Sequence, residues 1–174
     1  MTATSDTTTD TAAGGARRRF VLVAVAVATV DLVSKAIASR ALAGRDVDLP
    51  GPLDLSLAYN SGVAFSVGVG VPPWVLVVLA TGIATVVAVA AWRGQFPSAV
   101  AAGLVVGGAA ANVVDRVQAG SVVDMLHTGW WPTFNLADVW IVVGCALLVL
   151  TELNAARRRD ASPSPTPTRG DGDP

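Results

Sequence analysis

Four long apolar stretches constrain the fold of this 174-residue chain more than any other feature. They cover about 20–38, 72–92, 97–117 and 138–153. A tilted helix needs roughly 17–25 residues to cross a bilayer, so each stretch can span it, the last one only if it extends further. Charged residues make up 14% of the chain, against about 25% in a typical soluble domain. The sequence therefore predicts an all-α membrane protein with four transmembrane helices.

Both ends of the chain differ from this apolar middle. Residues 1–16 are rich in Thr, Ala, Asp and Gly and have no apolar periodicity, which is typical of disordered segments. Residues 157–174 begin with a run of Arg and continue with alternating Ser, Thr and Pro, which is also a disordered composition. We therefore expect one membrane domain over 17–156, between two disordered tails.

Basic residues predict the orientation in the membrane. Arg17–Arg19, Arg93 and Arg157–Arg159 fall at the N-terminus, in the second connection and at the C-terminus. With four spans these segments share one side, and the positive-inside rule makes that side cytoplasmic. The first connection also contains Arg40 and Arg45, but three Asp residues accompany them. Both termini are therefore expected in the cytoplasm, and the first and third connections outside.

The first outer connection has a strand-like pattern. Leu53–Leu57 alternates apolar and polar residues, Asn60–Gly62 is a turn signal, and Val63–Val67 is again β-prone. We expect a small extracytoplasmic β-sheet or hairpin between the first two helices, lying on the membrane surface. An irregular loop is the alternative.

Two groups of polar residues lie within the predicted spans, where ionisable side chains are costly and usually functional. Asp31 and Lys35 are four residues apart and share a helix face, which favours an internal ion pair that orients helices over a catalytic lysine. Asn112, Asp115 and Arg116 cluster near the outer end of the third span. This cluster fits a structural polar network and direct substrate contact equally well.

Asp124 and Asp138 stand apart because neither has an obvious local basic partner. Asp138 begins the last apolar stretch, where a carboxylate can cap a helix N-terminus. If both residues converge, one pKa rises and the pair can share a proton, so that one carboxylate activates water while the other polarises a carbonyl group. Their separation in the sequence neither requires nor forbids this convergence.

No metal or cofactor site is expected from the composition. The chain has one His, His127, and one Cys, Cys145, which excludes a zinc-type ligand cluster. Trp130, Trp131 and Trp140 are interpreted as an aromatic belt at the membrane interface, with a substrate-lining role as the secondary possibility.

Five motifs together resemble lipoprotein signal peptidase, or signal peptidase II, a family of bacterial aspartyl membrane proteases. The motifs occur in the family's order and cover most of the predicted membrane core: Asp31–Lys35, Asn60–Phe65, Gly107–Arg116, Val122–Asp124 and Phe134–Asp138. Each motif alone is weak, whereas all of them in order on four spans are specific. The chain departs from the family at Ala111, where Gly is usual, and at Met125, where Phe is common.

The resemblance implies that Asp124 and Asp138 are the catalytic pair. It also implies supporting or substrate-binding roles for a larger polar set, which consists of Asp31, Lys35, Asn60, Gly62, Asn112, Asp115, Arg116 and Asn135. Asn135 lies one helical turn before Asp138 and could orient its carboxylate.

The implied function is an endopeptidase of the bacterial cytoplasmic (inner) membrane with its active site at the extracytoplasmic face. Its substrate would be a prolipoprotein with a diacylglyceryl-modified cysteine, cleaved on the N-terminal side of that cysteine. We expect a monomer in contact with membrane lipids, without a cofactor, a metal or a nucleic-acid partner. Two alternatives remain open: a small transporter or proton pathway, which would stage charges at several depths, and a structural scaffold with satisfied ion pairs.

Overall fold

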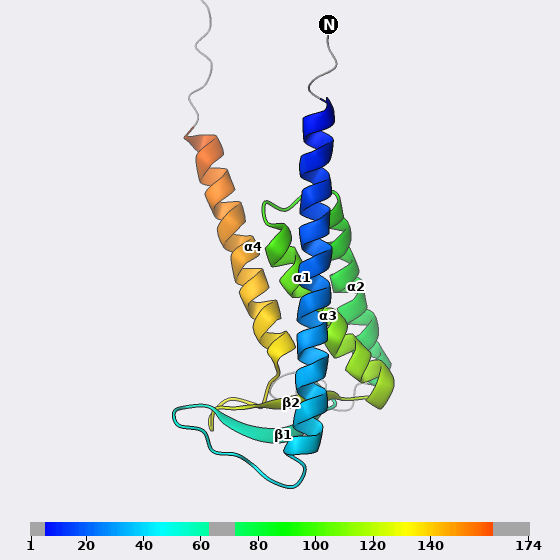
Figure 1. Cartoon of the computed structure of the whole chain (residues 1–174), viewed down its shortest axis with the longest axis vertical. Helices are drawn as coiled ribbons and strands as arrows, with labels where there is room; N and C mark the ends of the chain where they lie inside the picture. The colour runs from blue at the N-terminus through cyan, green and yellow to red at the C-terminus, as the bar shows by residue number, and fades with distance from the viewer. Residues whose placement is uncertain (1–5, 63–71, 162–174) are drawn as a thin grey trace, which may run out of the picture.

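The computed structural model describes residues 6–62 and 72–161, which form four helices and two short strands (Figure 1). In chain order these elements are α1 (Asp6–Ala41), β1 (Asp54–Asn60), α2 (Pro73–Trp92), α3 (Ala99–Ala119), β2 (Val122–His127) and α4 (Leu136–Asp160). All four helices are long and apolar enough to cross a membrane. The predicted four-helix membrane fold is therefore confirmed.

The first and last helices, α1 and α4, extend beyond the predicted domain limits. α1 begins at Asp6 and α4 ends at Asp160, so parts of the segments predicted as disordered tails are helical. The physical reason is that adding a residue to an existing helix avoids the cost of nucleation. In α4, Arg157–Arg159 also interact favourably with the negative end of the helix dipole. The remainder of each tail lies outside the described residues.

α3 is the central helix of the bundle and packs against α1, α2 and α4. Glycines allow this close approach, as the Gly- and Ala-rich composition of the third span indicates. A Cβ atom added at Gly107 would lie 2.5 Å from the backbone oxygen of Ala24 in α1, and one added at Gly108 would lie 2.7 Å from that of Ala137 in α4. α1 and α4 are therefore held close to the same segment of α3, just before its polar end.

The small sheet is present, and among the described residues the strand that pairs with β1 comes from outside the first connection. β1 pairs antiparallel with β2, which comes from the connection between α3 and α4, with Ala58 opposite Asp124 and Asn60 opposite Val122. Both connections leave the bundle at the same end, so their edges can meet. Local patterning identifies a strand and does not select its partner. The other segment expected to be β-prone, Val63–Val67, lies outside the described residues.

The sheet rests on the end of α1 through a small apolar cluster. Its buried members are Ala38 of α1, Leu42 just after that helix and Met125 of β2, with Leu55 and Leu57 of β1 packed against them. The sheet lies at one end of the bundle, and the start of α1 and the end of α4 lie at the other (Figure 1). The first and third connections therefore share one end, as the hydropathy pattern predicts.

Candidate active site

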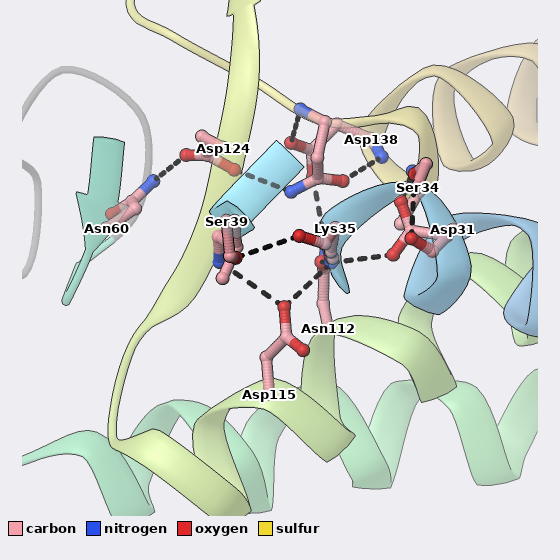
Figure 2. A network of polar contacts seen from close by, with 12 residues as sticks. Asp31, Ser34, Lys35, Ser39, Asn60, Asn112, Asp115, Asp124 and Asp138 are labelled. Carbon is pink, nitrogen blue, oxygen red and sulfur yellow. Dashed lines mark hydrogen bonds and ion pairs between the residues drawn. The ribbon is translucent and has the colours of Figure 1, made fainter. Parts of the chain in front are cut away.

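Asp124 is held by β2 in a nearly sealed position, with 2% of the residue exposed. Each of its carboxylate oxygens accepts a hydrogen bond from an asparagine amide. Asn135 Nδ2 donates to Oδ1 at 2.6 Å. Asn60 Nδ2 donates to Oδ2 at 3.0 Å (Figure 2). β1, β2 and the start of α4 therefore meet at this one side chain.

Burial raises the pKa of Asp124 from the usual 3.8 to about 6. The main cause is the loss of hydration of the carboxylate, and the negative charge of Asp138 acts in the same direction. The hydrogen bonds from Asn135 and Asn60 oppose this rise because they stabilise the ionised form. Asp124 can therefore take up or release a proton near neutral pH.

Asp138 lies in the first turn of α4 and takes part in a reciprocal cap. Asn135 is the N-cap residue: its Oδ1 accepts from the Asp138 backbone N–H at 3.0 Å, and Asp138 Oδ2 accepts from the Asn135 backbone N–H at 3.2 Å. The expected capping role of Asp138 is thus present, with Asn135 as its partner. Because the same Asn135 side chain donates to Asp124, it links the two aspartates.

The other oxygen of Asp138 is contacted by α3. Asn112 Nδ2 donates to Asp138 Oδ1 at 3.0 Å, while Asn112 Oδ1 accepts from Lys35 Nζ at 2.7 Å (Figure 2). An ammonium group can only donate, so Lys35 turns the amide oxygen toward itself and the amide NH₂ toward Asp138. Lys35 therefore fixes Asn112 as a donor to this carboxylate.

Lys35 is buried and has three acidic or amide partners, which match the three N–H donors of an ammonium group. Besides Asn112, it pairs with Asp31 Oδ2 at 2.6 Å and with Asp115 Oδ2 at 2.9 Å. Asp31 Oδ1 also accepts from the backbone N–H of Ala137 at 2.7 Å. The ion pair expected from the i,i+4 spacing is present, and it also joins α1 to α3 and to the start of α4.

Arg116 connects the end of α3 to the turn after β1. Its Nη2 donates to the backbone oxygen of Gly62 at 3.0 Å, and the Gly62 N–H donates to Asn60 Oδ1 at 3.0 Å. That second bond turns the amide of Asn60 toward Asp124. The Nε atom of Arg116 is buried and has no hydrogen-bond partner among the described residues.

A groove of about 470 Å³ runs along the start of α4, with Asp138 in its wall. The rest of the lining is mostly apolar and consists of Thr128, Trp130, Trp131, Phe134, Val139, Val142 and Val143. Trp130 and Trp131 stack edge to face with ring centres 5.4 Å apart. Two of the three tryptophans interpreted as an interface belt thus line this groove beside Asp138.

Sequence reasoning missed the valines of this groove. Val142 lies four residues after Asp138 and shares its face of α4, whereas Val139 and Val143, one turn apart from each other, line the groove from the adjacent face. An apolar stretch that spans a membrane has many such valines, and nothing local marks those that face a groove.

Within 6–62 and 72–161, no cluster of three or more His, Cys, Asp or Glu side chains is arranged to hold a metal ion.

All of the supporting residues predicted from sequence meet at the sheet end of the bundle. Comparison with known proteins identifies the family to which the chain is related. The family model described as "Signal peptidase (SPase) II" matches residues 23–154. The chain belongs to the signal peptidase II family. The resemblance found from the five motifs is therefore confirmed.

Curated relatives are similar over most of their length. The lipoprotein signal peptidase of Mycobacterium tuberculosis (strain ATCC 25618 / H37Rv) is 39% identical over 148 residues, which is 78% of this chain and 71% of the relative. That of Rhodococcus jostii (strain RHA1) is 41% identical over 143 residues, 77% of this chain and 71% of the relative. A solved bacterial membrane enzyme at 2.3 Å resolution has the same fold, with a TM-score of 0.74 at 24% identity over 84% of this chain and 94% of that one.

Proposed function

We propose that this signal peptidase II family member is a membrane aspartyl endopeptidase that removes the signal peptide from diacylglyceryl-modified prolipoproteins. Cleavage falls on the N-terminal side of the lipidated cysteine. The observation that carries the proposal is the pair Asp124 and Asp138, joined through Asn135 beside an apolar groove. Family membership supports the signal-peptidase activity, and the geometry of this pair supports the aspartyl mechanism.

The two aspartates differ in environment, which suggests their roles. Asp138 is partly exposed and lies in the wall of the groove, where water and substrate can reach it. Asp124 is sealed, and burial raises its pKa to about 6. In our proposal Asp138 is the general base and Asp124 holds the shared proton.

The reaction then needs only water and these two groups. Asp138 takes a proton from water, and the water oxygen attacks the scissile carbonyl carbon while Asp124 gives its proton to the carbonyl oxygen. The tetrahedral intermediate collapses as the C–N bond breaks, the leaving nitrogen takes the proton from Asp138, and Asp124 recovers its own from the new carboxyl group. In this proposal Arg116, whose Nε has no hydrogen-bond partner among the described residues, supports the negative charge that develops on the carbonyl oxygen before the proton is transferred.

The surroundings of the pair suit a substrate that stays in the membrane. The groove wall offers valine and tryptophan side chains to the apolar part of such a substrate. By the positive-inside rule, the arginine-rich end of the bundle faces the cytoplasm and the sheet faces outward. In our proposal the enzyme therefore works as a monomer at the outer face of the cytoplasmic membrane, with both termini in the cytoplasm.

Substitution of each aspartate by asparagine tests the pair. Asp124→Asn and Asp138→Asn should each lower cleavage of a diacylglyceryl-modified prolipoprotein by at least about a hundredfold, because each removes a proton-transfer group. The assay follows substrate size on a gel with detergent-purified protein. Asp48→Asn, an exposed position at the same end, is the matched control and should cleave normally. Full activity in either dyad variant, with the helical circular dichroism unchanged, would contradict the mechanism.

A further inference from the structure

A second cavity lies at the opposite end of the bundle from the active site. It has a volume of about 420 Å³ and lies between α1 and α2, lined by Phe20, Ala88, Val89, Trp92 and Arg93. α1 and α2 touch each other at few points, so the space between them is not closed by helix packing. Its lining is apolar toward the middle of the helices and basic at the end, where α2 stops.

Arg17 is exposed and contacts Trp92, which lines this cavity, through two interactions. Its guanidinium carbon lies 5.2 Å from the centre of the Trp92 ring, and its Nε donates to the backbone oxygen of Trp92 at 3.1 Å. The stacking and the hydrogen bond order the side chain, so little conformational entropy remains to be lost on binding. The bond uses Nε, which leaves the Nη donors for an anion.

The charge around the cavity has one sign. Arg18 and Arg19 follow Arg17, and Arg93 lines the cavity itself, whereas neither 13–20 nor 88–98 contains an acidic residue. A phosphate group at the cavity would therefore meet Arg17 and Arg93 and no carboxylate from these two segments. Clefts of this volume are within the range of about 300–1,000 Å³ that is usual for small-molecule sites.

We propose that this crevice, named here the α1–α2 crevice, binds an anionic phospholipid. Arg17 and Arg93 contact its phosphate, and one acyl chain lies along Phe20, Ala88 and Val89. The position explains the choice of lipid over free phosphate, because Trp92 and Arg17 lie where apolar helix gives way to basic loop, the level of lipid headgroups. This site is separate from the aspartate pair, and the proposal does not depend on peptidase activity.

The test compares lipid binding by variants of the full chain. Phosphatidylglycerol and phosphatidylcholine with identical acyl chains are titrated onto the detergent-purified protein, and bound lipid is counted by native mass spectrometry. The wild type should prefer phosphatidylglycerol, and Arg17→Gln with Arg93→Gln should lower its affinity for that lipid by about tenfold or more. Arg157→Gln with Arg159→Gln removes the same charge from exposed positions of α4 and should have no comparable effect. An equal loss in both double variants would overturn the proposal in favour of general attraction.

A second variant tests the acyl-chain part of the site. Ala88→Leu fills the crevice and keeps every charge, so it should also lower phosphatidylglycerol affinity by several-fold while the thermal midpoint without lipid stays unchanged. Inorganic phosphate should not displace the lipid at equal concentration. Unchanged lipid affinity in Ala88→Leu, or displacement by phosphate alone, would overturn the proposal that the crevice holds a lipid.

Discussion

α2 and α3 are consecutive helices of nearly equal length, 20 and 21 residues, and both are apolar enough to cross a membrane. In the most apolar stretch of α2, no residue is buried within the molecule. In the most apolar stretch of α3, half of the residues are buried. α2 faces mainly lipid, which requires only that its side chains be apolar. α3 packs against the other three helices, so its sequence must supply glycines for close contact and polar groups that find partners.

The first test of this difference removes the positive charge of Lys35, which joins α1 to α3 through its ion pairs. Lys35→Met leaves the buried Asp31 and the partly buried Asp115 without their cation, and it should lower the free energy of unfolding by about 3–5 kcal/mol. Arg40→Met makes the same change at an exposed position of α1 and should cost less than about 0.5 kcal/mol. Denaturant titration in detergent micelles measures both. Equal stability of the two variants would mean that the ion pairs do not hold the bundle.

A pair of alanine substitutions contrasts the two helices directly. At Gly107 in α3 a new Cβ would lie 2.5 Å from a backbone oxygen of α1, so Gly107→Ala should cost about 1–3 kcal/mol. At Gly82 in α2 nothing lies within 4 Å, and Gly82→Ala should be neutral or stabilising by up to about 1 kcal/mol. The thermal unfolding midpoint should therefore fall in Gly107→Ala and stay the same or rise in Gly82→Ala. A loss in both variants would show that α2 packs against something more specific than lipid.

The smallest predicted effect concerns the pH dependence of the site that α3 supports. Asn60 donates a hydrogen bond to Asp124, which lowers the pKa of that carboxyl. With this bond present, the pKa of Asp124 is about 6. Asn60→Ala removes a donor to the ionised form, so the pKa should rise by about one unit, equivalent to the ~1.4 kcal/mol of one hydrogen bond to a charged group.

A higher pKa of Asp124 would shift the pH profile of kcat/KM in a defined direction. If Asp124 must hold a proton, activity is lost as pH rises through its pKa, and Asn60→Ala should move that alkaline limb upward. Ser61→Ala, at an exposed neighbouring position, should leave the profile unchanged. Movement of the acid limb instead would mean that Asp124 is the base and Asp138 the acid.

Several particulars of the site could be predicted from local spacing. Asp31 and Lys35 pair as their i,i+4 spacing indicates, and the capping position of Asp138 follows from its place at the start of an apolar stretch. The link between Asn112 and Asp138 could not be predicted, because it depends on how α3 and α4 are rotated toward each other. Local spacing places Asn112 beside Asp115 and Arg116, yet its amide contacts α1 and α4.

The sequence by itself determined the number of spans, the shared side of the basic connections and the polar residues worth attention. These properties depend on composition and on periodicity within single segments, where the bilayer sets the length and the charge that each can carry. Only the tertiary structure decided that β2 is the partner of β1, that Lys35 orients Asn112, and that Trp130 lines a groove. The first two contacts join segments far apart in the chain, and helix rotation and close packing at glycines determine which side chains meet. The groove is formed within 128–143, where the loop before α4 folds back against the start of that helix.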